Sequence, residues 1–414
     1  MIARIHAGKA SGTVSAPPSK SMAHRLLLAA GLSEGESRIR NLAGSEDILA
    51  TADCLRALGK TVLLKDGEAV LSGPGVPGSD HESTGIPDKP VLLPVRESGS
   101  TLRFLIPIAL TLGREVRFTG TKRLFERPLS VYEDLARKEG FLFERDEDSL
   151  LVKGNLRAGS YLIPGWISSQ FVSGMLFALP NLLGDSRIEL LPPVESRPYI
   201  DMTMQALHLF GIETGWSGEL TIEIPGGQKS RAQEYAVEGD YSNAAFLEVL
   251  NVLGGTVRIE GLDPLSLQGD RIYAEHFKAI QKGFAEIDIS DCPDLGPVLF
   301  AAAAAMHGGR FTGTGRLRLK ESDRCQAMQE ELLKFGIRCE NDADSFTVCP
   351  GELRAPSQRL YGHNDHRIVM ALSSLCTLCG GEIEGAEAVR KSWPEYFDTL
   401  KKLGIEVEQY AVDQ

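Results

Sequence analysis

The chain has 414 residues, which is long for one hydrophobic core, so two domains are expected. Apolar residues make up 43% of the sequence, which is typical of a globular protein and excludes a disordered one. The 56 acidic residues exceed the 44 basic ones and give a formal net charge of -12, which argues against nucleic acid or an anionic membrane surface as a partner.

Targeting signals and disulfides are not expected. Residues 1–5 turn polar at once and lack the apolar core of a secretion signal, so we expect a cytoplasmic protein. The longest apolar stretches, such as 298–306, fall far short of the roughly 20 residues that cross a bilayer. The seven cysteines should stay reduced thiols. Cys376 and Cys379 have the spacing of half a zinc site, but no second pair accompanies them, and we interpret both as core thiols.

A unit of helix, glycine and short strand occurs six times along the chain. Its spacing of roughly 55–80 residues is too long for a solenoid repeat. The six copies are 24–40, 102–119, 171–191, 244–259, 295–312 and 368–383. A second helix follows each copy and ends at a glycine, the residue that favours a left-handed helix stop. These second helices are predicted at 47–58, 130–139, 199–210, 271–282, 324–335 and 394–403.

Three such units in each half of the chain predict two globules of similar design. The loop 225–230 lies near the middle and is interpreted as the hinge between them. It ends like a phosphate-binding loop, but Gln228 interrupts the Gly-Lys-Ser sequence that such a loop requires.

Cations beside helix starts predict a site for anions. Helix N-termini favour negative ligands through their backbone N–H groups and dipoles. Lys20, Arg25, Arg103 and Arg367 lie at or within one turn of predicted helix starts, where a positive charge costs roughly 0.3–1 kcal/mol unless an anion compensates it. Ordinary capping by Ser, Thr and Asp explains the polar residues at these starts but not the cations. Together they indicate a binding site for polyanions.

Eight short motifs in one order connect the chain to a known family. They are Pro18-Ser19-Lys20-Ser21 with Arg25, Ser98-Gly99-Ser100-Thr101-Leu102-Arg103, Glu126-Arg127-Pro128, Ser168-Ser169-Gln170-Phe171, Arg197-Pro198-Tyr199-Ile200-Asp201, Lys320-Glu321-Ser322-Asp323-Arg324, Asn364-Asp365-His366-Arg367 and Lys391. Over nearly its whole length the chain resembles the 5-enolpyruvylshikimate-3-phosphate synthases. Any one motif is a weak signal, whereas all eight in the family order are a strong one.

The resemblance implies an α/β fold of two similar globules, each built from three βαβαββ-like units in an inside-out barrel, with the active site in the cleft between them. The implied N-terminal globule is 18–228, and the C-terminal globule is 1–17 plus 229–414. The implied reaction transfers the enolpyruvyl group of phosphoenolpyruvate to the 5-hydroxyl of shikimate-3-phosphate through a tetrahedral intermediate, and releases phosphate. Besides these two substrates, no cofactor, metal or other partner is implied, and a monomer is expected.

Residue roles follow from the matching motif positions. Shikimate-3-phosphate is expected to contact Lys20, Ser21, Arg25, Ser168, Ser169, Gln170, Ser196, Tyr199, Asp294 and Lys320. Phosphoenolpyruvate is expected to contact Lys20, Gly99, Arg123, Gln170, Arg324, Arg367 and Lys391, where arginine forks suit carboxylate and phosphate oxygens.

The predicted catalytic set is Asp294, Glu321, Lys20 and His366. The resemblance gives Asp294 the proton of the 5-hydroxyl and makes Glu321 the acid that protonates the methylene carbon of phosphoenolpyruvate. The alternatives are a helix N-cap for Asp294 and a solvated helix carboxylate for Glu321. Two positions depart from the family pattern: Glu97 replaces a usual asparagine, and Arg316 replaces another.

Three other functions compete with this prediction. The sister enolpyruvyl transferase that acts on UDP-N-acetylglucosamine carries a reactive cysteine in a loop that matches 119–128, where this chain has none. A non-catalytic protein that binds phosphorylated metabolites would not need both Asp294 and Glu321. A metalloenzyme that used His363 and His366 would lack a third ligand nearby in the sequence.

Overall fold

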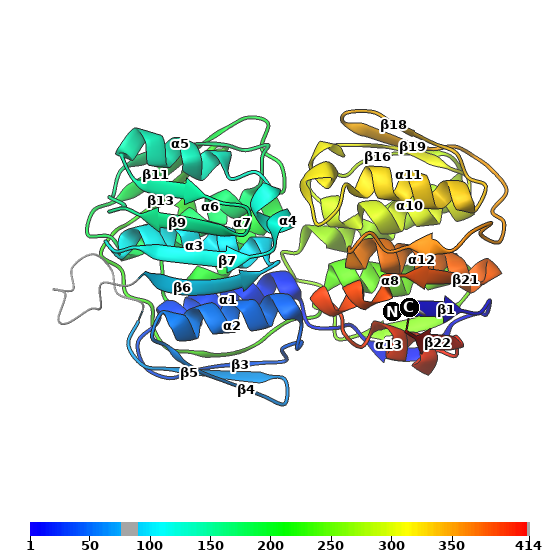
Figure 1. The fold of residues 1–414 in the computed structure, drawn as a ribbon, viewed down its shortest axis with the longest axis horizontal. Coiled ribbons are helices and arrows are strands. Elements are labelled where there is room, and N and C mark those ends of the chain that lie inside the picture. The colour runs from blue at the N-terminus through cyan, green and yellow to red at the C-terminus, as the bar shows by residue number, and fades with distance from the viewer. Residues whose placement is uncertain (76–89, 412–414) are drawn as a thin grey trace. The chain divides into compact units, whose positions relative to one another are not determined.

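A computed structural model describes residues 1–75 and 90–411 (Figure 1). The chain divides into two compact units: unit 1 combines Met1–Ser19 with Glu238–Gln414, and unit 2 is Lys20–Val237. The second boundary lies later than residue 228, the last residue expected in the N-terminal globule. The cause is strand β14 (Glu234–Ala236), which pairs in parallel with β3 (Ser37–Arg40) of unit 2. The predicted hinge 225–230 is therefore part of unit 2, where the Gly227 amide donates to the carbonyl of Leu182 at 2.6 Å.

Unit 2 repeats one sheet topology three times within its described residues. A parallel pair continues into two antiparallel strands, in the orders β14-β3-β5-β4, β6-β7-β9-β8 and β10-β11-β13-β12. The further strands are β4 (Thr61–Lys65), β5 (Glu68–Ser72), β6 (Val91–Arg96), β7 (Val116–Gly120), β8 (Leu142–Arg145), β9 (Ser149–Lys153), β10 (Ser160–Pro164), β11 (Ser186–Leu191), β12 (Gly215–Trp216) and β13 (Thr221–Ile224). The helices are α1 (Lys20–Leu32), α2 (Glu46–Ala57), α3 (Gly99–Thr111), α4 (Lys122–Glu126), α5 (Ser130–Glu139), α6 (Ser169–Ala178) and α7 (Arg197–Leu209).

Unit 1 uses the same order in two sheets, β16-β17-β19-β18 and β20-β21-β1-β22, and adds the parallel pair β15-β2. Its strands are β1 (Ile2–Ile5), β2 (Ser11–Ser15), β15 (Thr256–Glu260), β16 (Ala285–Asp288), β17 (Gly309–Thr312), β18 (Cys339–Asn341), β19 (Ser345–Val348), β20 (Leu360–Tyr361), β21 (Gly381–Glu384) and β22 (Val407–Tyr410). Its helices are α8 (Tyr241–Val252), α9 (Tyr273–Lys282), α10 (Gly296–Ala305), α11 (Arg324–Lys334), α12 (His366–Cys379) and α13 (Tyr396–Lys402).

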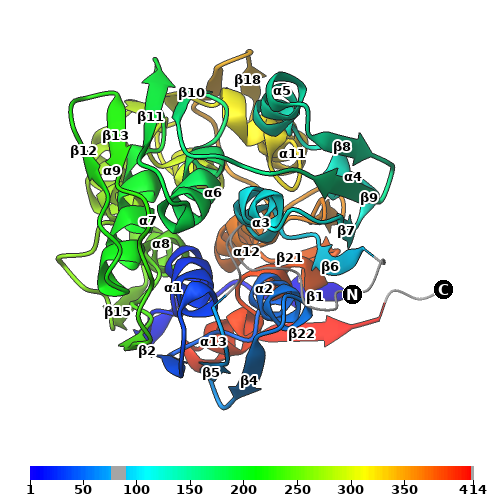
Figure 2. The same cartoon turned by 90° about the vertical axis from the view of Figure 1, so that its left-hand side faces the viewer.

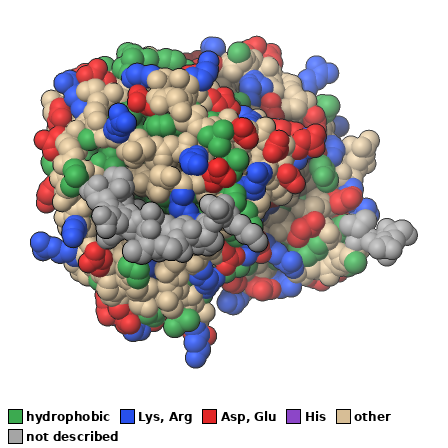
Figure 3. Space-filling model, turned by 60° about the vertical axis from the view of Figure 1, so that its left-hand side comes forward, with side chains coloured by type: hydrophobic (Ala, Val, Ile, Leu, Met, Phe, Trp, Pro, Cys, Tyr) green, Lys and Arg blue, Asp and Glu red, His purple; other side chains and the backbone are tan. Residues whose placement is uncertain are grey.

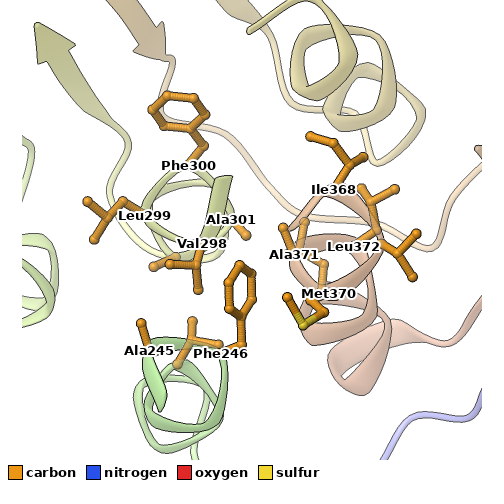
Figure 4. Packing of buried hydrophobic residues seen from close by; sticks show 14 of the residues in the cluster. Ala245, Phe246, Val298, Leu299, Phe300, Ala301, Ile368, Met370, Ala371 and Leu372 are labelled. Carbon is orange, nitrogen blue, oxygen red and sulfur yellow. The ribbon is translucent and has the colours of Figure 1, made fainter. Parts of the chain in front are cut away.

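The first helices of the repeats, such as α3, α6, α10 and α12, are buried along nearly all their length and form the interior of each unit, with the sheets around them. In unit 2, α6 packs on both α3 and α7, and Figure 2 shows the three sheets around these helices. In unit 1, α8, α10 and α12 meet through side chains such as Phe246, Val298 and Ala371 (Figure 4). Helix α10 is apolar on every face and is buried along nearly all its length, as an all-apolar helix must be in water. The apolar residues of the first helix of each repeat therefore pack in the core. The polar residues at the start of that helix are available to form a binding site.

Local signals place several helix ends correctly. Helix α5 spans Ser130–Glu139 as predicted and stops at Gly140, whose φ of 71° suits glycine. Helix α7 begins before the predicted residue 199 because Pro198 fits the first helical turn.

Charged side chains of both signs lie on the surface (Figure 3), and the cysteines are buried or half-buried. On the face in Figure 3, Lys and Arg side chains are mixed with Asp and Glu. All seven cysteines lie in the described residues and are free, and burial raises the pKa of Cys325 to about 12. Within 1–75 and 90–411, no helix combines the length and apolar character needed to cross a membrane.

Candidate active site

One buried guanidinium organises the polar cluster of unit 1. Arg324 begins α11, and its side chain is 1% exposed. Its Nη1 donates to Asp294 Oδ1 at 2.9 Å, its Nη2 to Glu321 Oε2 at 2.9 Å and its Nε to Asp365 Oδ2 at 2.8 Å. Burial alone would lower the pKa of Arg324, but the three carboxylates raise it well above its ordinary value. A single side chain thus connects the two carboxylates to which the family resemblance assigns proton transfer.

Asp294 lies in a short 3-10 turn, Pro293–Leu295, directly before α10. Besides Arg324, its carboxylate accepts from Lys320 Nζ at 3.2 Å and from Arg367 Nη2 at 3.1 Å. The N-cap residue of α10 is Leu295, so the alternative of an N-cap at Asp294 does not describe this turn. Burial lowers the pKa of Lys320, while Asp294 opposes that shift. Three cations converge on one carboxylate, which marks the place where unit 1 can compensate negative charge.

Asp365 fixes the start of α12 against the same cluster. Its Oδ1 accepts from the Arg367 amide at 2.9 Å as the N-cap, and its Oδ2 accepts from the Ser322 hydroxyl at 3.1 Å as well as from Arg324. Burial would raise the pKa of Asp365, but Arg324 lowers it below its ordinary value. His366 is buried beside Asp365, with Nδ1 3.7 Å from Oδ1. Asp365 therefore aligns the segment that carries the predicted residues His366 and Arg367.

Lys391 joins this cluster through the backbone. Its Nζ donates to the carbonyl oxygen of Asn364 at 2.7 Å, next to the Asp365 cap. The structure thus brings together the predicted unit 1 residues Asp294, Lys320, Glu321, Arg324, His366, Arg367 and Lys391 within one local network.

In unit 2, side chains from the starts of α3 and α6 meet. Arg103 Nη1 donates to Gln170 Oε1 at 2.9 Å, and Gln170 Nε2 donates to the Ser100 hydroxyl at 2.9 Å. Ser168 caps α6 by accepting from the Gln170 amide at 3.2 Å. A Cβ at Gly99 would lie 2.6 Å from Arg127 Nη1 and 2.9 Å from Arg103 Nη1, so glycine leaves room for two guanidinium groups there. The sequence predicted Gly99, Ser168 and Gln170 separately, and the structure joins them.

Arg25 serves the fold of unit 2 as well as its predicted site. Its side chain is buried and donates to the hydroxyl of Thr203 at 2.9 Å, to the carbonyl of Ser21 at 2.7 Å and to the carbonyl of Tyr199 at 2.8 Å. Burial lowers the pKa of Arg25 to about 10. Arg25 therefore ties the start of α1 to the start of α7, which are the positions of the predicted residues Ser21 and Tyr199.

Lys20 and Ser196 complete the polar positions of unit 2. Lys20 Nζ lies 3.1 Å from Asp47 Oδ2, a partner on α2 that the sequence did not identify. Ser196 is buried and has a φ of 55°, a left-handed conformation that is uncommon in residues with a Cβ.

The comparisons with known proteins support the same reading. The family described as EPSP synthase (3-phosphoshikimate 1-carboxyvinyltransferase) matches residues 6–400. A 3-phosphoshikimate 1-carboxyvinyltransferase of Clostridium kluyveri is 39% identical over 99% of this chain and 98% of its own length, and one of Clostridium novyi is 36% identical over 99% of each. The chain belongs to the EPSP synthase family.

Solved structures show that this family's fold is present. The EPSP synthase of Acinetobacter baumannii has a TM-score of 0.75 at 23% identity and covers 99% of this chain and 100% of its own. The enolpyruvyl transferase NikO from Streptomyces tendae has a TM-score of 0.76 at 15% identity and covers 98% of each chain. The predicted family, α/β fold and enzyme class, enolpyruvyl transfer in the shikimate pathway, are confirmed.

The two departures from the EPSP synthase pattern have different surroundings. Arg316 is buried, and its Nη2 donates to the carbonyl of Ser290 at 2.5 Å, which anchors it in the turn before Asp294. Glu97 is half-buried directly before the α3 start that holds Gly99.

The structure does not join the two histidines that were considered as metal ligands. His363 lies with Glu330 and Glu331 in the described residues, whereas His366 belongs to α12 beside Asp365. The spacing of His363 and His366 therefore does not make one ligand set.

Sequence reasoning missed Asp270, a buried carboxylate in the 3-10 turn Gly269–Ile272. It accepts a hydrogen bond from the Ser242 hydroxyl of α8. Burial and then the negative charge of Asp294 raise its pKa to about 6, while Arg367 acts in the opposite direction. In the sequence Asp270 looks like any aspartate at a helix start, so no local signal separates it from a cap.

Asp270→Asn is expected to become more stable relative to the parent protein as pH rises from about 4 to about 6. The raised folded-state pKa means that Asp270 binds its proton more tightly in the folded protein than in the unfolded chain, whose Asp pKa is about 3.9. Its contribution to stability is therefore complete below about pH 4 and is lost as pH rises through about 6. Urea unfolding of both proteins between pH 4 and 8 measures this difference. A difference in unfolding free energy that stays constant over this range contradicts the assignment.

Proposed function

We propose that the chain binds phosphoenolpyruvate and shikimate-3-phosphate and that Asp294 and Glu321 divide the proton transfers between them. The observation that supports this division is the Arg324 fork, which holds both carboxylates at 2.9 Å. Two carboxyl groups held on separate nitrogens of one guanidinium keep fixed positions, and a positioned acid or base typically contributes 10²–10⁴-fold to a rate.

The addition step uses the two carboxylates in opposite directions. Asp294 accepts the proton of the 5-hydroxyl of shikimate-3-phosphate, while the oxygen of that hydroxyl forms a bond to C2 of phosphoenolpyruvate. Glu321, in its protonated form, gives a proton to C3, so that the methylene becomes a methyl group in the tetrahedral intermediate. In the elimination step, C3 returns a proton to Glu321, the double bond re-forms, and the C2–O bond to phosphate breaks. Asp294 gives the proton that it took from the 5-hydroxyl to the departing phosphate, which returns both carboxyl groups to their starting states.

The surrounding cations compensate the charge of the substrates. In the proposal, Arg324, Arg367 and Lys391 face the carboxylate and phosphate of phosphoenolpyruvate, and Lys320 faces shikimate-3-phosphate. Arg324 and Arg367 already contact Asp294. The same two cations therefore compensate the charge of the proton acceptor and the charge of the substrate. Fixed cations of this kind stabilise a transition state without reorganisation.

Unit 2 supplies polar groups for the same reaction. Serine and tyrosine hydroxyls lie at the starts of three helices and suit shikimate-3-phosphate. These residues are Ser21, Ser168, Ser169, Ser196 and Tyr199. Arg25 donates to the backbone carbonyls of Ser21 and Tyr199, which belong to two of these helix starts. Gly99, Gln170 and Arg123 are assigned to phosphoenolpyruvate, and Lys20 to both substrates.

Release of phosphate tests the proposed substrates directly. Purified protein is incubated with phosphoenolpyruvate and shikimate-3-phosphate, with and without a chelator, and with UDP-N-acetylglucosamine in place of shikimate-3-phosphate. We expect phosphate release only with the first pair, unchanged by the chelator. The proposal is contradicted if phosphate is released only when UDP-N-acetylglucosamine replaces shikimate-3-phosphate beside phosphoenolpyruvate. It is also contradicted if the chelator abolishes the release.

Arg123→Ala is expected to weaken phosphoenolpyruvate binding by about 10- to 150-fold, the loss of one charge-assisted contact, and to change shikimate-3-phosphate binding far less. Arg123 is half-exposed on α4 and lies 3.6 Å from Glu126, and such exposed pairs add little to stability. Calorimetric titration with each ligand measures both affinities. The matched control is Lys122→Ala, which removes the neighbouring exposed cation. Equal weakening of both ligands in Arg123→Ala sinks the assignment.

Location and assembly complete the proposal. We place the protein in the cytoplasm as a monomer, in agreement with the mixture of basic and acidic side chains on the face in Figure 3. Sedimentation at micromolar concentration is expected to give a mass near 45.0 kDa, and a stable dimer contradicts the proposed state.

A further inference from the structure

A second contact between α11 and the segment before α12 lies away from the Arg324 cluster. Glu331 is buried on α11 and accepts from the Tyr361 amide at 2.9 Å and from His363 Nε2 at 3.0 Å. The same carboxylate accepts from Lys334 Nζ at 2.8 Å. Burial would raise the pKa of Glu331, but these hydrogen bonds lower it. A buried charge with this many donors is costly to disturb, which makes it a strong anchor.

The anchored segment contains two strained residues. His363 has a φ of 49° and Asn364 a φ of 52°, consecutive left-handed conformations in residues that carry a Cβ. Each such residue is disfavoured and persists only where its surroundings fix it. Glu331 fixes the side before the turn through Tyr361 and His363, and Arg324 fixes the side after it through Asp365 at 2.8 Å. Helix α11 thus clamps both ends of the turn.

The 363–364 turn also orients the carbonyl group of Asn364 toward Lys391. That oxygen accepts from Lys391 Nζ at 2.7 Å, and the next residue, Asp365, caps α12 at Arg367. Relaxation of the turn would move the carbonyl that holds Lys391 and the cap that aligns Arg367.

We propose that Glu331, acting through His363, is a positioning residue for phosphoenolpyruvate binding: it holds the 363–364 turn in the conformation that places Lys391 and Arg367. This inference rests on the proposed function, which assigns both cations to phosphoenolpyruvate. Glu331 contacts the turn and not the substrate.

A metal site at the same residues is a weaker explanation. Glu330, Glu331 and His363 lie close enough to share an ion. However, the Lys334 ammonium lies 2.8 Å from Glu331 Oε1 and 2.9 Å from Oε2, so a cation already compensates this carboxylate. The contacts therefore describe an internal anchor.

Glu331→Gln is expected to raise KM for phosphoenolpyruvate about tenfold or more and to leave KM for shikimate-3-phosphate within about twofold. The amide removes the charge that the His363 and Lys334 contacts share. The matched control is Glu330→Gln, which changes the exposed neighbouring carboxylate of the same helix. Glu330 lies 3.9 Å from His363 Nε2, beyond hydrogen-bond distance, so this variant should leave both constants within about twofold. Steady-state kinetics with each substrate varied in turn measures these values, and a thermal melt confirms that the variants are folded.

A second variant keeps the test decisive if Glu331→Gln does not fold. His363→Gly tolerates the left-handed φ but removes the contact with Glu331, so it should raise the same KM without a large loss of stability. Lys391→Met should add less to KM in the Glu331→Gln background than in the parent, because the two residues act on one contact. Additive effects, or an unchanged KM for phosphoenolpyruvate in both variants, overturn the inference. An inactive parent protein overturns the proposed function instead.

Discussion

Replacing Asp294 by asparagine is expected to slow turnover at least about 100-fold while both substrates still bind. Asparagine has nearly the same shape, but its amide cannot accept the 5-hydroxyl proton. The structure adds a second expectation, because Asp294 compensates Lys320, Arg324 and Arg367. With the carboxylate neutralised, these cations should attract phosphoenolpyruvate at least as strongly as before, so the loss appears in kcat and not in KM.

Steady-state kinetics and calorimetry separate these two effects. The matched control is Asp288→Asn, an exposed aspartate at the end of β16 that accepts from the Ser290 amide at 2.8 Å. It should retain the parent kcat. If Asp294→Asn turns over at the parent rate, the carboxylate only balances charge, and the proton acceptor has to be sought elsewhere in the chain.

The repeated fold was predictable because its signals are local. Each helix start, glycine stop and short strand is encoded within a few residues, as at Ser130–Glu139 and Gly140. The second crossing between the units was not predictable in this way. It depends on the pairing of β14 with β3, two segments far apart in sequence, whereas the turn-like residues 225–230 indicated an earlier boundary at residue 228.

Residues of the candidate site could be predicted where a charge lies at an unfavourable position in the sequence. They could not be predicted where a charge lies at a position that is common in solvated proteins. A cation at a helix start opposes the dipole, and that conflict identified Lys20, Arg103 and Arg367 from the sequence. Asp270 and Glu331 lie at positions where carboxylates are common on solvated helices, so their burial is visible only in the folded chain. Arg25 shows the limit of the charge argument, because neutral carbonyl and hydroxyl oxygens of the protein accept from its guanidinium.

Three carboxylates of unit 1 share one hydrogen-bond donor, the guanidinium of Arg324. Arg324 binds Asp294, Glu321 and Asp365 at once, so a change at any one of them alters the hydrogen bonds of the other two. Effects of single variants in this cluster should therefore be non-additive, and each role has to be tested by a measurement specific to its own proton.

For Glu321, that measurement is exchange at carbon. Glu321→Gln is expected to bind both substrates but to lose, by at least about 100-fold, the incorporation of solvent deuterium into the methylene group of phosphoenolpyruvate. The glutamine keeps an oxygen that can accept from Arg324 Nη2, the contact that Glu321 makes at 2.9 Å, so the geometry of the cluster is preserved. Only the capacity to give and take the carbon proton is removed.

Exchange is more decisive than turnover because a residue that merely shapes the pocket slows addition and elimination without selectively abolishing protonation at carbon. Mass spectrometry of phosphoenolpyruvate recovered from saturated enzyme in deuterated water measures the exchange. The control is Glu330→Gln, which changes an exposed carboxylate on α11, the helix that begins at Arg324. Exchange at the parent rate in Glu321→Gln would show that another group is the carbon acid. Lys20 or His366 would then be the next candidate. His366 is buried beside Asp365 and Lys20 pairs with Asp47, so Lys20→Met and His366→Gln in the same exchange assay would decide between them.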